Sequence, residues 1–303
     1  MNDELLNAFL KAQQFLGRPK LARWAQKPLR YVLALTWSYG LYPVLHKGLS
    51  ARCSLFTGDK ITVPLPAGLD LYLAGLKSHP SELRLVRYML NTLKGGDVAI
   101  DAGAHLGYFT LVMASCVTEE GVVVAFEPSE RIAVFLRRNT LHKLQVRTEK
   151  WMLSAGKGES TFHEFSLRNS EFNTSILRVS EKTLPSKSKV VSTTSLDEYC
   201  KEYQIVPVFL KLDVEGGEYN ILKGALTILD EVKSIAIELR KRDYPVLYAP
   251  AVALLEQMGF IAFQIEDDGT LKHLPDVGAF IESLADESDN VVFRREPGVS
   301  GRE

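Results

Sequence analysis

Cysteine is scarce in this 303-residue chain, and so are apolar runs long enough to cross a membrane. The three cysteines, Cys53, Cys116 and Cys200, are odd in number and lack C-x-x-C spacing, which argues against a disulfide framework or a zinc site and favours a reducing compartment. The apolar stretch at 31–45 is shorter than the ~20 residues needed to span a bilayer, and no small-residue cleavage site follows a hydrophobic N-terminus. We therefore expect a cytoplasmic protein without a transmembrane helix.

Acidic residues are absent from positions 5–58. The same segment holds eight basic residues: Lys11, Arg18, Lys20, Arg23, Lys27, Arg30, Lys47 and Arg52. Because the whole chain has a net charge of −1, this segment at +8 leaves the rest at −9. A basic segment of this kind either docks on the acidic remainder, which we favour, or makes peripheral contact with an anionic membrane through residues 18–37. The acidic remainder lacks a basic, aromatic-rich face, so we expect no nucleic-acid partner.

The G-x-G-x-x-G motif of dinucleotide sites is also missing where a strand pattern meets a helix pattern. Residues 101–110 read D-A-G-A-H-L-G-Y-F-T instead. Gly103 and Gly107 allow a tight turn whose N–H groups face a ligand, and Asp101 can bind a ligand ammonium or order the turn. One close-approach glycine fits the amino-acid tail of S-adenosylmethionine better than a pyrophosphate. An NAD-dependent oxidoreductase is therefore disfavoured.

Strand and helix patterns alternate from residue 98 onward, which predicts a mostly parallel sheet covered on both faces. The expected strands are 98–102, 122–126, 146–153, 208–214 and 234–239, and the expected helices are 108–117, 131–142, 196–203, 219–229 and 251–258. The S-x-x-E spacing of Ser195 and Glu198 predicts a capping box at one helix start. Two last strand patterns, 260–265 and 290–294, predict a terminal hairpin, and 180–189 has the composition of a polar loop.

Helical patterns to about residue 47 and short strands over 51–73 predict an N-terminal extension, which we place at 1–74. The main domain is expected at 75–297, opening with a helix over 80–93, and 298–303 is expected to be a flexible tail.

A second acid ends the strand pattern at 122–126. Glu127 and Pro128 stand about 20 residues beyond Gly107. A carboxylate at the tip of a second strand can accept both hydroxyls of a ribose. The alternative is that Glu127 caps the helix that begins near Ser129, but its combination with the glycine turn favours a nucleoside site.

A third motif, F-L-K-L-D-V-E-G-G-E at 209–218, delivers Asp213 and Glu215 to the sheet edge where open α/β sheets bind ligands. Glu238 ends the next strand pattern. These three carboxylates and His105 are the candidate general bases, although a turn histidine often makes only a local hydrogen bond.

Together the three motifs resemble those of the FkbM family of S-adenosylmethionine-dependent methyltransferases, over about residues 70–296. The matching family strings are D-x-G-A-N-x-G-Y-Y-T, the acid of Phe126-Glu-Pro128, and F-I-K-I-D-V-E-G-x-E. The resemblance implies a class I methyltransferase, Rossmann-like fold with a seven-stranded, mostly parallel sheet and a C-terminal antiparallel hairpin. It also implies S-adenosyl-L-methionine as cofactor and methyl transfer to a hydroxyl of a sugar, glycan, lipid-linked or secondary-metabolite acceptor.

The resemblance also implies the site residues. Cofactor contacts are expected at Asp101, Gly103, His105, Gly107, Tyr108, Glu127, Pro128, Ser154 and Asp213, and catalysis is expected from Asp213, Glu215, Glu238 or His105. His105 departs from the family's usual asparagine. Ala155 stands where the family often has an acid near the adenine, so recognition there would rest on the backbone or on Ser154. No metal is expected, because the adjacent Asp–Asn ligand pair of catechol methyltransferases is missing. The alternative function is a nucleoside-binding module without turnover that acts through its basic N-terminal segment.

Overall fold

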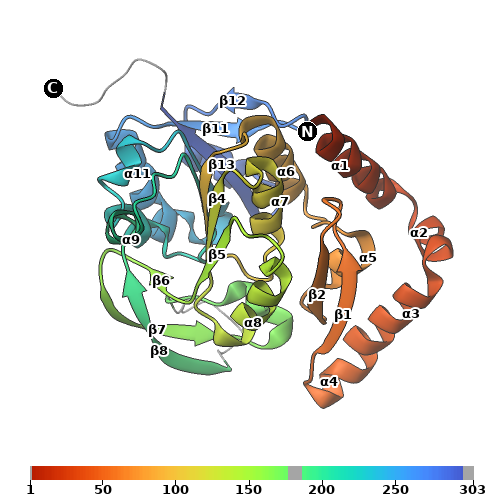
Figure 1. Cartoon of the computed structure of the whole chain (residues 1–303). Coiled ribbons are helices and arrows are strands. Elements are labelled where there is room, and N and C mark those ends of the chain that lie inside the picture. The colour runs from red at the N-terminus through yellow and green to blue at the C-terminus, as the bar shows by residue number, and fades with distance from the viewer. Residues whose placement is uncertain (1, 177–185, 296–303) are drawn as a thin grey trace.

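An eight-stranded sheet with helices on both faces forms the centre of the molecule (Figure 1). The computed structural model describes residues 2–176 and 186–295, so the expected tail at 298–303 and most of the expected polar loop lie outside the described residues. In spatial order the strands are β12 (Leu271–His273), β11 (Ile261–Ile265), β13 (Ser288–Arg294), β10 (Ser234–Arg240), β9 (Phe209–Leu212), β3 (Val98–Ala102), β4 (Val122–Phe126) and β5 (Val146–Glu149).

The strand directions match those that the family resemblance implies. Strands β10, β9, β3, β4 and β5 pair in parallel, whereas β13 is antiparallel to β10 and to β11. The expected terminal hairpin is thus the pairing of β11 with β13. The sheet has one strand more than the seven expected, because a turn at Gly269, which has a φ of +80°, folds β12 back onto β11.

Successive residues of the central strands face opposite layers, as in a sheet that is buried on both sides. Ala99 belongs to the hydrophobic cluster under one set of helices, and its neighbour Ile100 belongs to the cluster under the other set. The first set is α6 (Pro80–Thr92), α7 (Tyr108–Val117) and α8 (Glu130–Thr140), and the second is α9 (Leu196–Tyr203), α10 (Glu218–Lys223), α11 (Ala249–Gln257) and α12 (Val277–Ser283).

The helix expected at 219–229 ends earlier than the sequence pattern predicts. The expected helix at 219–229 stops at Lys223, and only a 3₁₀ turn, Ile228–Asp230, follows. Gly224 ends it where a Cβ would stand 2.3 Å from the main-chain oxygen of Ser154. The start of α9 is as expected, since the Ser195–Glu198 capping box is present.

The expected strand at 146–153 is split between two sheets. Its second half belongs to a small sheet of order β6-β8-β7 that the sequence did not predict. The strands of this sheet are β6 (Met152–Leu153), β7 (Gly158–Glu164) and β8 (Lys187–Thr194). Residues 187–189 are therefore strand and not loop.

The N-terminal extension is helical first and then forms a hairpin, as expected, but it ends in a helix. Its elements are α1 (Asn2–Gly17), α2 (Lys20–Gln26), α3 (Pro28–Leu35), the π-helical η1 (Thr36–Leu41), α4 (Tyr42–Leu45), β1 (Leu49–Ser54), β2 (Lys60–Leu65) and α5 (Leu69–Ala74). The expectation of strand up to residue 73 was wrong for α5. Left-handed Gly75 caps α5, and its buried Leu71 and Tyr72 pack toward the protein.

The extension packs against the helices that cover one face of the main sheet. Phe9 and Ile61 lie in the same hydrophobic cluster as the buried residues of α6 and α7. The Asn139 side chain on α8 accepts a hydrogen bond from the Thr62 N–H at 2.7 Å and donates to the Leu106 carbonyl at 2.9 Å. The carboxamide thus connects β2 to the glycine turn of the main domain.

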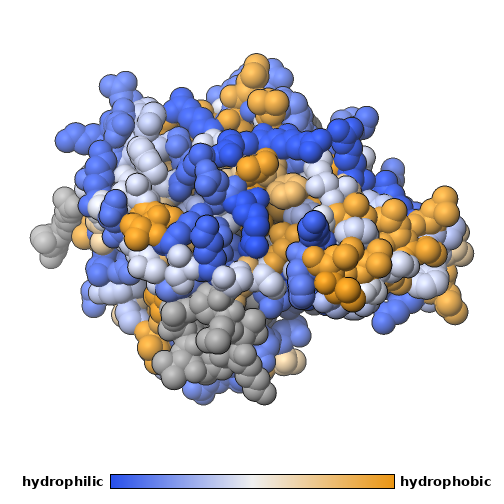
Figure 2. All heavy atoms as spheres, turned by 90° about the horizontal axis from the view of Figure 1, so that it is seen from below, coloured by the Kyte–Doolittle hydropathy of each residue, from blue (hydrophilic) through white to orange (hydrophobic). Residues whose placement is uncertain are grey.

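The outer surface of the N-terminal helices is strongly apolar, as Figure 2 shows on its right side. Leu21 is 82% and Leu29 is 84% exposed. Among the described helices, none combines the length and the apolar character needed to cross a membrane.

Candidate active site

A cavity opens at the carboxyl ends of β3, β4 and β9, the edge that the sequence motifs indicated. Five of the expected site residues line it: Gly103, His105, Glu127, Pro128 and Asp213. The remaining expected residues, Asp101, Gly107, Tyr108, Ser154, Glu215 and Glu238, are not among those that line the cavity.

The glycine turn brings the backbone of β3 into direct contact with that of β9. Gly103 has a φ of +80°, and a Cβ there would stand 1.9 Å from the Asp213 carbonyl oxygen. Gly107 has a φ of +87° and is the N-cap residue just before α7. Only glycine can adopt this conformation and allow the close approach at residue 103, so the turn requires a residue without a side chain at this position.

Asp101 lies under the turn. Its side chain is fully buried, and Oδ2 accepts a hydrogen bond from the Thr110 hydroxyl at 2.6 Å. Lys211 Nζ lies 3.5 Å from Asp101 Oδ1 and 3.1 Å from Asp213 Oδ2, so the buried lysine has two carboxylate partners. These two carboxylates raise the pKa of Lys211, although burial opposes them. The geometry favours the turn-ordering role for Asp101.

Glu127 is buried at the tip of β4 and accepts two backbone hydrogen bonds. Oε2 accepts from the His105 N–H at 3.0 Å, and Oε1 accepts from the Ser129 N–H at 2.9 Å. Burial raises the pKa of Glu127 to about 7, although these hydrogen bonds work against the shift. The helix-capping contact and the position at the cavity wall are thus both present, and each oxygen retains acceptor capacity for a ligand hydroxyl.

His105 stands in the turn with a φ of +49°. Its Nε2 lies 2.9 Å from the Ser170 hydroxyl. Burial, with a further effect of the Lys77 ammonium, lowers the pKa of His105 to about 3, so the imidazole is neutral at physiological pH. A ring of such low basicity is poorly suited to hold a proton during catalysis.

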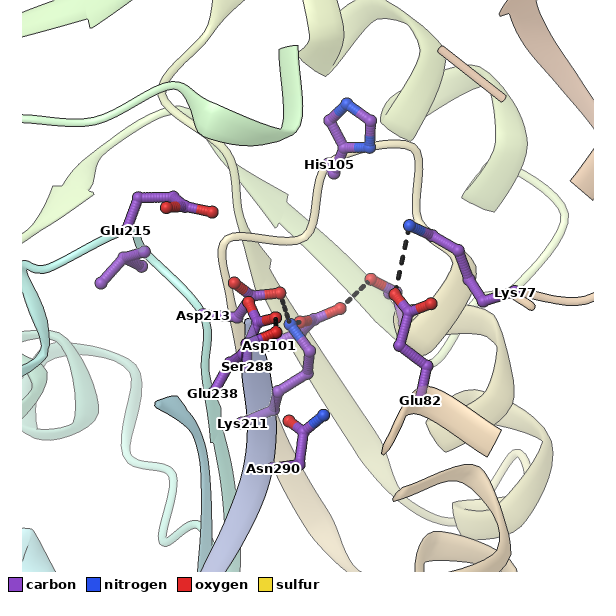
Figure 3. A network of polar contacts seen from close by, with 12 residues as sticks. Lys77, Glu82, Asp101, His105, Lys211, Asp213, Glu215, Glu238, Ser288 and Asn290 are labelled. Carbon is purple, nitrogen blue, oxygen red and sulfur yellow. Dashed lines mark hydrogen bonds and ion pairs between the residues drawn. The ribbon is translucent and has the colours of Figure 1, made fainter. Parts of the chain in front are cut away.

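The three candidate carboxylates lie together beyond the turn (Figure 3). Asp213 and Glu238 stand side by side over Lys211, and Glu238 Oε1 accepts a hydrogen bond from the Ser288 hydroxyl at 2.7 Å. Glu215, which has a φ of +63°, forms an ion pair with Arg240. The carboxylates of neighbouring strands therefore meet although they are far apart in the chain.

Asp213 and Glu238 titrate as a pair. Burial and the Asp213 charge raise the pKa of Glu238 well above its usual range. For Asp213, burial acts in the same direction, but the Lys211 ammonium and a hydrogen bond with Glu238 outweigh it and hold the pKa at about 2. The pair thus shares one proton and carries one negative charge.

One carboxylate oxygen from each of Asp213, Glu215 and Glu238 lies within 4.8 Å of the other two, a spacing that can also hold a cation. Lys211 and Arg240 already provide positive charge to this group. The electrostatics of the cluster are therefore balanced by the chain itself, and metal-free chemistry stays our prediction.

The other end of the cavity is apolar. Its walls there are Phe126, Trp151, Met152, Leu153 and Phe162. Ser154 follows this wall, and its N–H donates to the Thr194 carbonyl at 2.9 Å. An apolar slot with a carboxylate at one side suits a base attached to a ribose.

Sequence reasoning missed most of the cavity lip. The lip includes η2 (Leu167–Phe172), from which Ser170 and Glu171 line the cavity, together with Asn173 and Ser175. The N-T-S sequence at 173–175 is compatible with a substrate loop or with a solvated loop, and the structure places Asn173 and Ser175 at the cavity wall. A second missed group is the pair of Lys77 and Glu82, 3.2 Å apart, near His105 in Figure 3.

The methyltransferase FkbM domain model matches residues 101–262. A comparison with curated protein sequences gave no match.

Solved methyltransferase structures share distant similarity with the chain. An O-methyltransferase from Thermotoga maritima is 16% identical, with a TM-score of 0.42, and the match covers 87% of this chain and 83% of that one. A methyltransferase from Agrobacterium tumefaciens is 9% identical, with a TM-score of 0.43 and coverages of 82% and 71%. An rRNA methylase from Streptococcus thermophilus is 11% identical, with a TM-score of 0.40 and coverages of 73% and 99%.

Proposed function

The chain belongs to the FkbM methyltransferase family, and we propose that this S-adenosylmethionine-dependent enzyme methylates a hydroxyl group of a sugar, glycan, lipid-linked or secondary-metabolite acceptor. The observation that carries the proposal is the position of Asp213 at the cavity wall with Glu238 beside it, because a hydroxyl nucleophile must lose its proton during transfer and these carboxylates could take it.

The cavity fits S-adenosylmethionine. The apolar wall at Phe126 and Leu153 would hold the adenine, and Glu127 would accept the ribose hydroxyls. Gly103, which lines the cavity at the glycine turn, would lie against the amino-acid tail. When bound, the cofactor supplies an electrophilic methyl group on a sulfonium.

The chain's own residues then orient and deprotonate the acceptor. Asp213 lines the cavity as a carboxylate and can accept a hydrogen bond from an acceptor hydroxyl at Oδ1 or Oδ2. The singly protonated pair is a weak base, because its lower pKa is about 2. Only after Glu238 loses its proton does the pair become basic enough to take the hydroxyl proton.

This assignment predicts a rate that rises with pH. Glu238 has a raised pKa, so the doubly ionised pair accumulates on the alkaline side of that pKa. Glu238→Gln removes the ionisation and is expected to abolish the rise and to lower kcat by about 100-fold. If the variant keeps the wild-type pH profile of kcat, the pair is not the base.

The reaction itself is tested with S-adenosylmethionine that carries a radiolabelled methyl group. Wild-type protein and the Glu127→Ala variant are incubated with host-cell extract, which is then separated into lipid, glycan, protein, nucleic-acid and small-molecule fractions. We expect label in a lipid, glycan or small-molecule fraction with the wild type alone, stable to mild alkali as a methyl ether is. Label released by alkali as methanol would identify a carboxyl ester, and label in RNA or DNA would identify a nucleic-acid acceptor. Cofactor binding without any transfer would favour the binding module.

The proposed setting is the cytoplasm. Cys53, Cys116 and Cys200 are buried free thiols, as expected in a reducing compartment.

A further inference from the structure

The N-terminal helices expose large apolar side chains to solvent. Of the 17 exposed large hydrophobic residues in the described part of the chain, nine lie between positions 21 and 45. Leu21, Leu29 and Val44 are 82%, 84% and 77% exposed, and Figure 2 shows the surface that they help to form. We call the exposed apolar side chains of residues 21–45 the apolar patch. Its concentration in one short segment distinguishes it from scattered surface leucines.

The helices are apolar on their inner and their outer sides. Tyr31 and Ala34 on α3 are buried against the protein. Leu29, Val32 and Leu33 lie on the same helix at spacings of three and four residues, and all three are exposed. A helix that only covers the core of a soluble protein has a polar outer face. The apolar outer face of α3 is therefore not needed for packing within this chain.

The charges of the segment point to the kind of partner. Among the described residues, none of the eight basic side chains between positions 5 and 58 forms an ion pair with a carboxylate. Lys27 and Arg30 donate instead to the carbonyls of Leu73 and Tyr72, at 3.3 Å each, at the end of α5. Docking of the extension therefore uses hydrogen bonds and apolar contacts and leaves its positive charge uncompensated.

Exposed basic residues stand at both ends of the apolar patch along the chain. Arg18 and Lys20 precede it, and Lys47 follows it. Trp24 and Tyr39, which are 42% and 63% exposed, add the amphipathic aromatic rings that are typical of membrane interfaces. A second copy of this chain would bring the same positive charge against itself, whereas an anionic lipid surface complements it.

We propose that α2, α3, η1 and α4 form a membrane-docking surface that binds anionic lipid bilayers peripherally. The apolar patch enters the headgroup region, and Arg18, Lys20 and Lys47 contact the lipid charges. This binding does not depend on methyl transfer.

The docking surface adjoins the cavity lip. Arg168, on η2, donates a side-chain hydrogen bond to the Ser38 carbonyl of η1, and its N–H donates to the Tyr42 hydroxyl at 3.3 Å. Its guanidinium also lies over the Tyr39 ring, 5.4 Å from the ring centre. Since Ser170 on the same η2 lines the cavity, the lip and the docking surface are held together.

The test is sedimentation of the full chain with vesicles, of phosphatidylcholine alone or mixed with phosphatidylglycerol. We expect binding to the mixed vesicles that weakens as salt screens the charges. The triple variant Leu21→Asp/Leu29→Asp/Val32→Asp is expected to lose binding, and Arg18→Gln/Lys20→Gln is expected to bind about thirtyfold more weakly.

The matched control is Leu144→Asp, at a leucine that is 94% exposed but lies between α8 and β5, outside the docking surface. It is expected to bind as the wild type does, and thermal unfolding verifies that all variants are folded. The proposal would be overturned if the wild-type protein did not bind anionic vesicles. It would also be overturned if Leu144→Asp and the triple variant lost vesicle binding to the same extent. Binding that survives high salt would remove the electrostatic basis for choosing a lipid. A concentration-dependent dimer in ultracentrifugation, lost in the triple variant without lipid binding, would assign the patch to a second copy.

Discussion

The catalytic edge of the sheet and the N-terminal helices place charge and apolar surface in opposite ways. At the sheet, Lys211 is 2% exposed and lies between Asp101 and Asp213, so its charge is inside and paired. In the helices, Lys20 is exposed and has no carboxylate partner among the described residues, and Leu29 in the apolar patch is 84% exposed.

This difference indicates what each region is built to contact. Buried, paired charges keep carboxylates in one geometry and separate their pKa values, which suits proton transfer at a defined point. Exposed apolar groups with free basic charge suit a broad, soft partner that needs no single geometry. The two regions can therefore be tested with the same kinds of substitution and opposite expected results.

The largest expected effect comes from the removal of the buried ammonium. Lys211→Met leaves Asp101 and Asp213 as uncompensated charges and is expected to lower the free energy of unfolding by about 3–5 kcal/mol. The same change at Lys20 is expected to stay within about 0.5 kcal/mol of the wild type. Urea unfolding of both variants measures the contrast, and similar values for the two would contradict it.

A methyl group added to the glycine turn tests the close approach of two strands. Gly103→Ala is expected to lower the free energy of unfolding by about 1–3 kcal/mol and to abolish cofactor binding, because its Cβ would meet the Asp213 carbonyl. Gly96→Ala is the control: Gly96 also has a positive φ, +87°, but no atom within 4 Å of the added Cβ. Calorimetric titration with S-adenosylmethionine should show binding in Gly96→Ala alone. Tight binding of S-adenosylmethionine by Gly103→Ala would show that the turn can accommodate the added methyl group.

The acid of β4 is expected to make cofactor binding pH-dependent. Glu127 has a pKa raised to about 7, and only its ionised form accepts both ribose hydroxyls, so affinity should fall by about tenfold per pH unit below 7. Glu127→Gln should lose this dependence and bind about 10–100-fold more weakly at pH 8. Titration at several pH values measures both effects. His105, with its pKa of about 3, does not titrate in this range, so a dependence that persists in Glu127→Gln would point to another group.

The smallest expected effect concerns the stability of the apolar patch. Leu21→Asn and Leu29→Asn should each change the free energy of unfolding by no more than about 0.5 kcal/mol, because these side chains are exposed in the folded protein as they are in the unfolded chain. Thermal and urea unfolding provide the measurement. A loss of several kcal/mol would mean that the patch contributes to the fold, and the comparison between the two regions would fail.

The local part of the fold was predictable from the sequence. The strand Val98–Ala102, the helix Tyr108–Val117 and the capping box at Ser195 depend on neighbouring residues, and the structure has them as expected. The strand ends then brought Gly103, Glu127 and Asp213 to one cavity, because the carboxyl ends of parallel strands share an edge.

The rest depends on contacts between distant segments. The small sheet of β6, β7 and β8 joins residues on both sides of a long polar connection, and its strand sequences are too polar to form a clear apolar pattern. Ser170 lies in a 3₁₀ segment without an apolar period. Lys77 forms an ion pair with Glu82 and lowers the pKa of His105 only because the fold brings these residues together. The helix at 69–74 was misassigned because a stretch of six residues fits either period.

The contact of Arg168 with the N-terminal helices bears on the speed of cofactor exchange. Ser170, two residues along the same segment, lies 2.9 Å from the His105 ring, so the lip can swing outward only if this contact breaks or if η1 moves with it. The rate at which spent cofactor leaves should therefore depend on residues of the extension that never touch it. A chain with Arg168→Ala should release its product faster and retain it for a shorter time, without any change in the groups that bind it.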